Sequence, residues 1–167
     1  AVVNFLAFWL LLVFQRLAEV RRARHNTRKL LKEGAHEFAP RHYPIMVLLH
    51  VLWFAAWLYE GLHQGVSWNP HWLAPALAGQ ALRAWAQRSL GPRWTTRILV
   101  FRHEQPMRHG PFRFLRHPNY VGVVLELLSF PLVFGAWRTA LGLSLANALL
   151  LSWRIRMEDK AWKTFGN

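Results

Sequence analysis

Five apolar blocks, separated by segments that are alternately basic and nearly uncharged, constrain this chain more than any other feature. The blocks cover residues 2–17, 44–62, 72–90, 120–135 and 139–153. A helix that spans a bilayer needs about 20 mostly apolar residues, with ~17 as a practical minimum. The second block meets this length by itself, and the others continue into flanks that are compatible with a helix. The sequence therefore predicts an all-α membrane bundle with about five transmembrane helices.

The basic residues follow an alternating pattern between these blocks. Eight Lys and Arg lie from the end of the first block (Arg16) to the start of the second, eight from the second half of the third block (Arg83 and Arg88) to the start of the fourth, and four in the C-terminal tail. The other two connections together carry only Arg138. Because cytoplasmic segments of membrane proteins collect Lys and Arg, we expect the N-terminus outside and the C-terminus in the cytoplasm. The protein is then a multi-pass integral membrane protein whose partners include membrane lipids.

Composition narrows the class of protein further. Hydrophobic residues make up 53% of the chain and charged residues 17%, whereas soluble domains average ~45–50% apolar and ~25% charged residues. The net charge of +13 by itself suggests a protein that binds nucleic acid. Because the basic residues are confined to alternate loops, we attribute them to membrane orientation and expect no nucleic-acid partner. An all-α soluble core is the structural alternative. The absence of Cys excludes disulfides, thiolate metal sites and cysteine nucleophiles, and we expect no metal.

A long polar segment precedes the fourth block. It runs from about residue 91 to 117 and is rich in Arg, His, Gly and Pro, and loops of this length are usually functional or disordered. Pro118 sits where a helix would start, so free amides beside Arg116 and His117 would attract an anion such as a carboxylate. A basic cap that binds lipid headgroups is the alternative. We expect one domain over residues 1–167, with three spans in 1–90 and the functional loop, hairpin and last helix in 91–167.

Charged residues within or beside the spans are the remaining candidates. Arg154 and Glu158 are four residues apart and share one helix face, where a solvated ion pair is the default interpretation. Ionisable groups inside a membrane are costly and indicate function, which singles out Glu126 and, less strongly, His50. Arg83 is expected to extend from its helix end toward water, as long basic side chains do.

Three segments resemble one known family. The segments GPF (110–112), RHPNYVG (116–122) and RIRMED (154–159) are similar to the G-x-Y, R-H-P-x-Y-x-G and R-I-x-x-E-E pattern of the isoprenylcysteine carboxyl methyltransferase family. The similarity covers about residues 90–165. Phe112 replaces the usual Tyr, and Asp159 replaces the second Glu.

The resemblance implies a membrane enzyme that transfers the methyl group of S-adenosylmethionine to the carboxyl or hydroxyl oxygen of a lipophilic or prenylated acceptor. It implies a cofactor site on the cytoplasmic side. The first cofactor-binding residue along the chain would be either His103 or Glu104. Arg154 would point at the acceptor, and Glu126 or His117 would serve as a base if the acceptor were a hydroxyl. The implied cofactor-binding residues are His103, Glu104, Gln105, Pro106, Met107, Phe112, Arg116, His117, Pro118, Asn119, Tyr120 and Glu158.

The residue chemistry agrees with this implication. The chain has no G-x-G segment, so it lacks the glycine-rich loop of dinucleotide-type folds. Glu158 suits an amine or ribose, and the rings of Tyr120 and Phe112 suit a sulfonium through cation–π attraction. Three alternatives stay open: a phospholipid N-methyltransferase, an all-α membrane reductase with a similar C-terminal half, and a non-enzymatic adaptor that binds anionic lipid.

Overall fold

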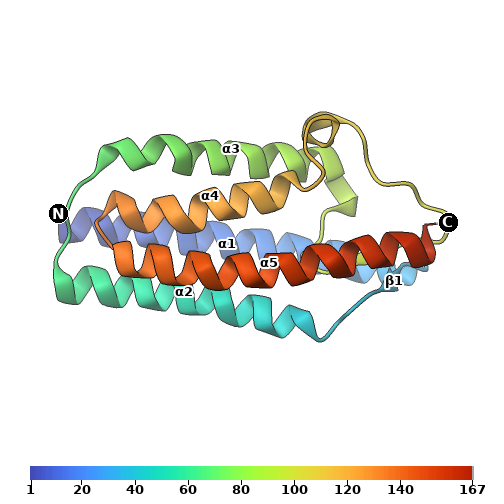
Figure 1. Cartoon of the computed structure of the whole chain (residues 1–167), viewed down its shortest axis with the longest axis horizontal. Coiled ribbons are helices and arrows are strands. Elements are labelled where there is room, and N and C mark those ends of the chain that lie inside the picture. Colours follow the sequence, from blue (N-terminus) through green and yellow to red (C-terminus); the bar gives the residue numbers. More distant parts are fainter. Residues whose placement is uncertain (167) are drawn as a thin grey trace.

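Five long helices lie side by side in the computed structural model, which describes residues 1–166. All five run approximately along the long axis of the molecule (Figure 1). They are α1 (Val2–Lys32), α2 (His42–Gln64), α3 (Leu73–Leu90), α4 (Pro118–Val133) and α5 (Trp137–Phe165). The predicted all-α bundle is therefore confirmed.

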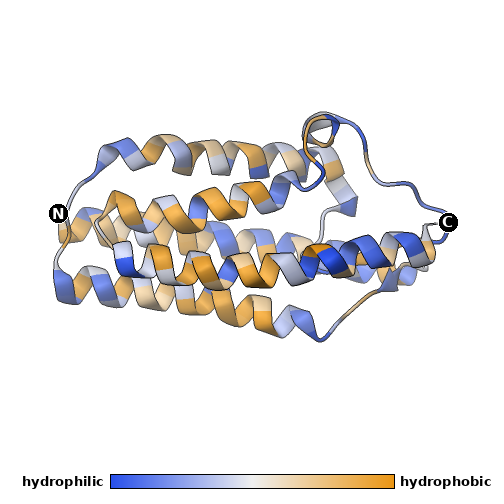
Figure 2. Cartoon of the chain, viewed as in Figure 1, coloured by the Kyte–Doolittle hydropathy of each residue, from blue (hydrophilic) through white to orange (hydrophobic). Residues whose placement is uncertain are grey.

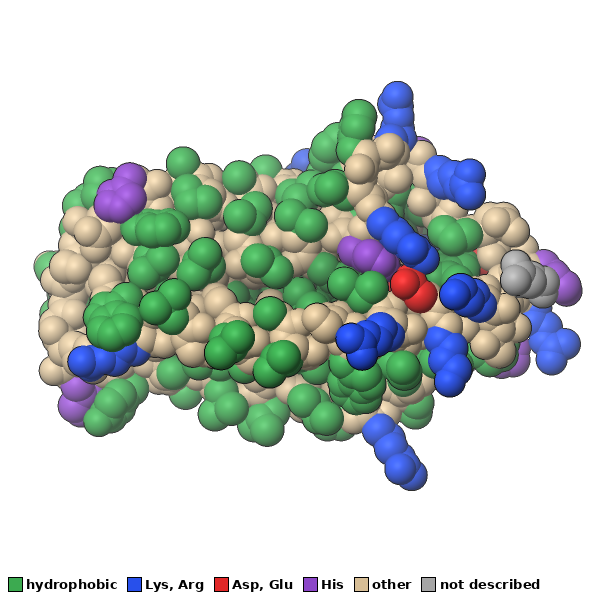
Figure 3. Space-filling model, viewed as in Figure 1, with side chains coloured by type: hydrophobic (Ala, Val, Ile, Leu, Met, Phe, Trp, Pro, Cys, Tyr) green, Lys and Arg blue, Asp and Glu red, His purple; other side chains and the backbone are tan. Residues whose placement is uncertain are grey.

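Two helices, α1 and α2, are long and apolar enough to cross a membrane, and α4 is a shorter apolar helix. In the most apolar windows of α1 and α2, only 11% and 28% of the residues are buried. Many apolar side chains, including Val3, Phe14 and Leu149, are at least two-thirds exposed on the outside of the bundle. Figure 3 shows such side chains over the length of the visible face. This apolar surface suits contact with lipid. The crossing of the membrane by all five helices, and their orientation in it, stay predictions.

The two basic connections lie at the same end of the bundle as the C-terminus (Figures 1 and 2). At this end the apolar half of α5 continues without a break into a charged half, and the whole helix has 29 residues. At 1.5 Å per residue it is about 44 Å long, which exceeds the ~30 Å hydrocarbon core of a bilayer. The last turns of α5 therefore extend past the apolar part of the bundle.

Short elements hold the long loop against this end of α5. Strand β1 (His36–Glu37) pairs antiparallel with β2 (Leu99–Val100), and 3-10 turns occupy Gly91–Arg93 and Gly110–Arg113. A further 3-10 turn, Pro70–Trp72, precedes α3. Ile98 and Val100 pack with Ala161 in a small apolar cluster. The loop is thus fixed against the charged end of α5.

Helices α3 and α4 approach closely at two glycines. A Cβ on Gly79 would lie 2.8 Å from the carbonyl oxygen of Gly122, and one on Gly122 would lie 2.9 Å from that of Gly79. Small residues allow such close backbone contact between membrane helices. Elsewhere aromatic and aliphatic side chains fill the core, and the Trp53 indole donates a hydrogen bond to the Leu127 carbonyl at 3.0 Å.

The polar face of α3 is buried against α1. Gln80 exchanges hydrogen bonds with Gln15, and the Gln87 amide accepts one from Arg22. Arg83 lies between these pairs and is only 4% exposed. The expectation that Arg83 extends toward water is therefore wrong, because carboxylates on α1 and α4 pair with its guanidinium inside the bundle.

Candidate functional site

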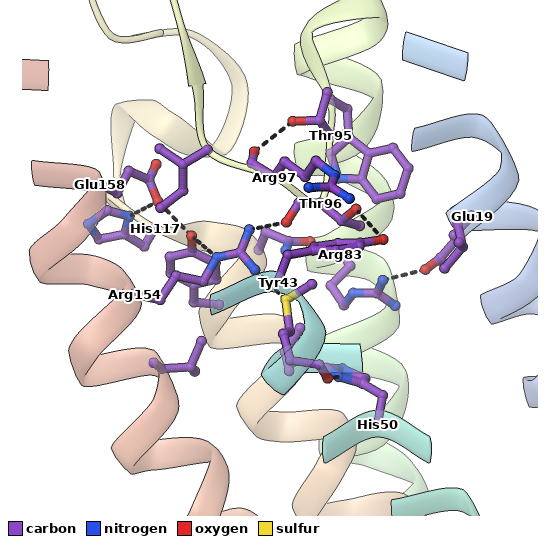
Figure 4. Close-up of a pocket in the computed structure, with 18 of the residues that line it drawn as sticks. Glu19, Tyr43, His50, Arg83, Thr95, Thr96, Arg97, His117, Arg154 and Glu158 are labelled. Carbon is purple, nitrogen blue, oxygen red and sulfur yellow. Dashed lines mark hydrogen bonds and ion pairs between the residues drawn. The ribbon is translucent and has the colours of Figure 1, made fainter. Parts of the chain in front are cut away.

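A cavity of about 1810 Å³ opens among α1, α2, α4, α5 and the long loop. Sites for drug-sized ligands usually measure ~300–1,000 Å³, so this cavity has room for two reactants. Arg154, Glu158 and His117 lie in it at the basic end (Figure 4). Away from that end, apolar side chains such as Val47, Phe54 and Leu150 form the wall.

Four residues that we call the polar cluster meet at the basic end: His117, Tyr120, Arg154 and Glu158. The Tyr120 hydroxyl donates to the Glu158 carboxylate at 2.6 Å and accepts a hydrogen bond from Arg154 Nε at 2.8 Å. The His117 ring stacks on Tyr120 with centroids 5.3 Å apart, and its Nδ1 is 4.0 Å from Glu158 Oε2. The polar cluster thus joins the start of α4 to the charged half of α5.

Arg154 differs from its expected role as a solvated partner of Glu158. Its side chain is buried, and Tyr120 stands between the two charged groups. The Arg154 guanidinium also contacts the Thr96 carbonyl oxygen and the Met46 sulfur. Three segments besides its own helix, namely α4, the long loop and α2, therefore fix its orientation.

Two buried polar atoms on the cavity wall at the start of α4 have no hydrogen-bond partner among residues 1–166. They are His117 Nε2 and Asn119 Oδ1. A buried polar atom without a partner costs ~1–3 kcal/mol, and such atoms are uncommon in native proteins. Their position in a large cavity fits a ligand that supplies the missing partners.

The structure divides the predicted cofactor residues into two sets. Those that line the cavity are Pro106, Met107, Phe112, Arg116, His117, Pro118, Asn119, Tyr120 and Glu158. His103, Glu104 and Gln105 are not among the lining residues. Glu104 instead accepts a hydrogen bond from Arg93 Nε at 2.7 Å and one from the Phe101 amide at 3.0 Å. Its carboxylate therefore stabilises the loop.

Arg116 is an exposed member of the first set. Its side chain is 71% exposed and pairs with Asp159 at 2.6 Å. Exposed ion pairs contribute only ~0–1 kcal/mol, so this pair can open at little cost.

Glu126 belongs to a different group, which we call the charged cluster: Arg16, Glu19, Arg83 and Glu126. Glu126 is completely buried and does not line the cavity. Its carboxylate accepts hydrogen bonds from Arg16 and from Arg83, the latter at 3.0 Å and 3.2 Å. Arg83 also pairs with Glu19. Because both its oxygens are occupied by guanidinium groups, Glu126 is unsuited to act as the base that we considered from the sequence.

Sequence reasoning missed the partners supplied by the N-terminal half. Met46 and Thr96 hold Arg154, and Arg16 and Glu19 belong to the charged cluster. A signal for the charged cluster was present, since buried membrane charges must find opposite charges. Met46 and the Thr96 carbonyl carry no such signal.

Comparison with known proteins adds family information to this geometry. Residues 72–164 match the model of the isoprenylcysteine carboxyl methyltransferase (ICMT) family. "Uncharacterized protein YpbQ" of Bacillus subtilis is 42% identical over 164 residues, covering 95% of this chain and 98% of that protein. An "Uncharacterized protein" of Haemophilus influenzae is 30% identical over 143 residues, covering 83% and 82% of the two chains. No solved structure matches.

Proposed function

Because the chain belongs to the isoprenylcysteine carboxyl methyltransferase family and is thus a membrane methyltransferase, we propose that it methylates an oxygen of a lipophilic acceptor with S-adenosylmethionine. The observation that carries this proposal is the polar cluster at one end of a large cavity whose remaining wall is mostly apolar. A polar cofactor and an apolar acceptor need such a divided cavity.

The residues of the polar end suit the cofactor group by group. Glu158 offers a carboxylate to an amine or to ribose hydroxyls. His117 Nε2 and Asn119 Oδ1, which have no hydrogen-bond partner among residues 1–166, offer further polar contacts. The Tyr120 ring is stacked by His117 and has the Arg154 guanidinium carbon 5.4 Å from its centroid. The ring of Phe112, which also lines the cavity, offers a face to a sulfonium, which is attracted to aromatic rings. When bound, the cofactor supplies a methyl carbon that is already activated for displacement.

The protein then has to align the acceptor oxygen with that carbon and exclude water. Arg154 is suited to orient the acceptor, because Tyr120, Thr96 and Met46 fix its guanidinium at the edge of the apolar region. The apolar wall of α2 and α5 accommodates the lipophilic part.

We also propose that all five helices cross the membrane, with the polar cluster at the cytoplasmic face. The concentration of Lys and Arg at that end of the bundle supports this orientation (Figure 3). A cofactor from the cytoplasm then reaches the polar end, and a lipophilic acceptor reaches the apolar wall.

Calorimetric titration of S-adenosylhomocysteine into detergent-purified protein tests the cofactor assignment. We expect Glu158→Gln to weaken binding at least about tenfold, since hydrogen bonds to charged groups contribute ~1.5–3 kcal/mol. Glu33→Gln makes the same chemical change at an exposed residue after α1 and should bind as the wild type does. Wild-type protein that does not bind the ligand would refute the proposal. If the wild-type protein binds it, a tritiated methyl-transfer assay with membrane lipid identifies the acceptor.

A further inference from the structure

His50 lies on the cavity wall, away from the cofactor residues. It belongs to α2 and follows Met46 by four residues, which is about one helical turn. Met46 in turn contacts the Arg154 guanidinium. Figure 4 shows Arg154 and His50 in the same pocket, on α5 and α2 respectively. His50 is therefore placed near the junction of the polar and apolar parts of the cavity.

The hydrogen bond of the His50 ring determines which nitrogen carries the proton. Nδ1 lies 2.9 Å from the Met46 carbonyl oxygen. A carbonyl oxygen can only accept a hydrogen bond, so Nδ1 is the donor and the neutral ring has a lone pair on Nε2. No described residue donates a hydrogen bond to that nitrogen.

The free hydrogen-bond acceptor at His50 Nε2 distinguishes between the two possible methyl acceptors, a carboxylate and a hydroxyl group. A carboxylate has no proton to donate, so the Nε2 lone pair would repel it. A hydroxyl group donates a hydrogen bond to Nε2 and gains nucleophilicity as its proton moves toward the nitrogen. The lining of the cavity beside α2 therefore favours a hydroxyl group.

We propose that His50 Nε2 accepts the proton of a hydroxyl-bearing lipophilic acceptor, so that the enzyme methylates hydroxyl groups in preference to carboxylates. This inference rests on the proposed methyltransferase function. The hydroxyl oxygen forms a bond to the methyl carbon, and the bond from that carbon to sulfur breaks with its electron pair left on sulfur. The hydroxyl proton moves to Nε2 and then to water from the open cavity.

The position of His50 in the chain separates the proposed preference from the segment that matches the family model. Residues 72–164 match the family model, whereas α2 ends at Gln64. All four residues of the polar cluster lie in the matched region, and His50 lies outside it. The matched part thus serves the shared cofactor chemistry, and α2 selects the acceptor.

The experiment compares two probes with the same chain length and different head groups, 4-dodecylphenol and dodecanoic acid, with tritiated S-adenosylmethionine. We expect wild-type protein to methylate the phenol faster than the acid. General bases typically contribute ~10²–10⁴-fold to rate, so His50→Phe should lower kcat for the phenol at least about 100-fold. His50→Gln should keep KM for the phenol near the wild-type value while kcat falls, because an amide accepts a hydrogen bond but not a proton.

His63→Phe is the matched control. His63 lies on the same helix, its Nδ1 is 3.0 Å from the Tyr59 carbonyl, and its side chain is exposed and outside the cavity. This variant should behave as wild type, and His50→Phe should keep its affinity for S-adenosylhomocysteine. Unchanged phenol methylation in His50→Phe overturns the inference. Wild-type protein that binds S-adenosylhomocysteine but does not methylate the phenol also overturns the inference. Wild-type protein that does not bind S-adenosylhomocysteine overturns the proposed function itself.

Discussion

Tyr120 donates a 2.6 Å hydrogen bond to Glu158 and so connects the first turn of α4 to the charged half of α5. The same hydroxyl accepts a hydrogen bond from Arg154. One oxygen atom therefore positions both a residue proposed to bind cofactor and the residue proposed to orient the acceptor.

Replacing Tyr120 with Phe removes this oxygen and keeps the ring. Glu158 then loses a donor and Arg154 loses an acceptor, and we expect S-adenosylhomocysteine to bind about tenfold more weakly, in line with ~1.5 kcal/mol for a hydrogen bond to a charged group. The ratio of affinities for S-adenosylmethionine and S-adenosylhomocysteine should be unchanged, because the aromatic face remains. Isothermal titration measures both.

Tyr59→Phe is the control for this change, since Tyr59 is 62% exposed and its hydroxyl has no partner among the described residues. Equal affinities in Tyr120→Phe and wild-type protein would show that the hydroxyl does not position Glu158.

Glu126→Gln tests the charged cluster as a determinant of stability. The substitution leaves Arg16 and Arg83 without the negative charge that they share in the bundle. Removing one partner of a buried ion pair typically costs ~3–5 kcal/mol. We expect a clearly lower Tm in detergent, and a partial recovery when Arg16→Gln is added, because the remaining Arg83 and Glu19 balance each other. An unchanged Tm for the single variant would contradict this role.

The sequence predicted the architecture of this chain better than its side-chain contacts. Apolar block lengths identify the five helices, because each block is long enough to form a helix that packs in the bundle. The alternating charge concerns orientation in a membrane, which stays a prediction. The resemblance implied that Tyr120 and Glu158 belong to one cofactor site, and their side chains are in contact because a helical hairpin brings them together. The bridging of Glu158 and Arg154 by Tyr120 was not predictable, because spacing along α5 says nothing about a residue inserted from α4.

Polar residues within the helices show where sequence reasoning fails. Arg83 was expected in water, yet Glu19 and Glu126 are available to it from helices that are distant in sequence. The role of a membrane charge depends on whether a neighbouring helix supplies its partner at the same depth. That information lies in the relative rotation of the helices, which a single sequence does not contain.

Glu60→Gln tests helix capping at the other end of the bundle. The buried Glu60 carboxylate accepts hydrogen bonds from the backbone amides of Arg138 at 3.0 Å and Thr139 at 2.7 Å, at the start of α5. A negative charge at a helix N-terminus contributes ~0.3–1 kcal/mol, and up to ~2 kcal/mol where it is partly buried. We expect a modest fall in Tm and unchanged affinity for S-adenosylhomocysteine. A change in that affinity would indicate that the α4–α5 turn communicates with the distant polar cluster.

Single-cysteine labelling tests the proposed orientation, and the absence of native Cys makes the starting protein silent. His71 and Arg138 are exposed at the end of the bundle with few basic residues, and Arg102 and Lys160 are exposed toward the basic end. In intact bacterial cells, a membrane-impermeant maleimide should label His71→Cys and Arg138→Cys but not Arg102→Cys or Lys160→Cys. Permeabilised cells should show labelling of all four. The reverse pattern would place the polar cluster outside, where the intracellular cofactor S-adenosylmethionine does not reach it. Labelling of only one of the first pair would mean that α3 and α4 do not both cross the membrane.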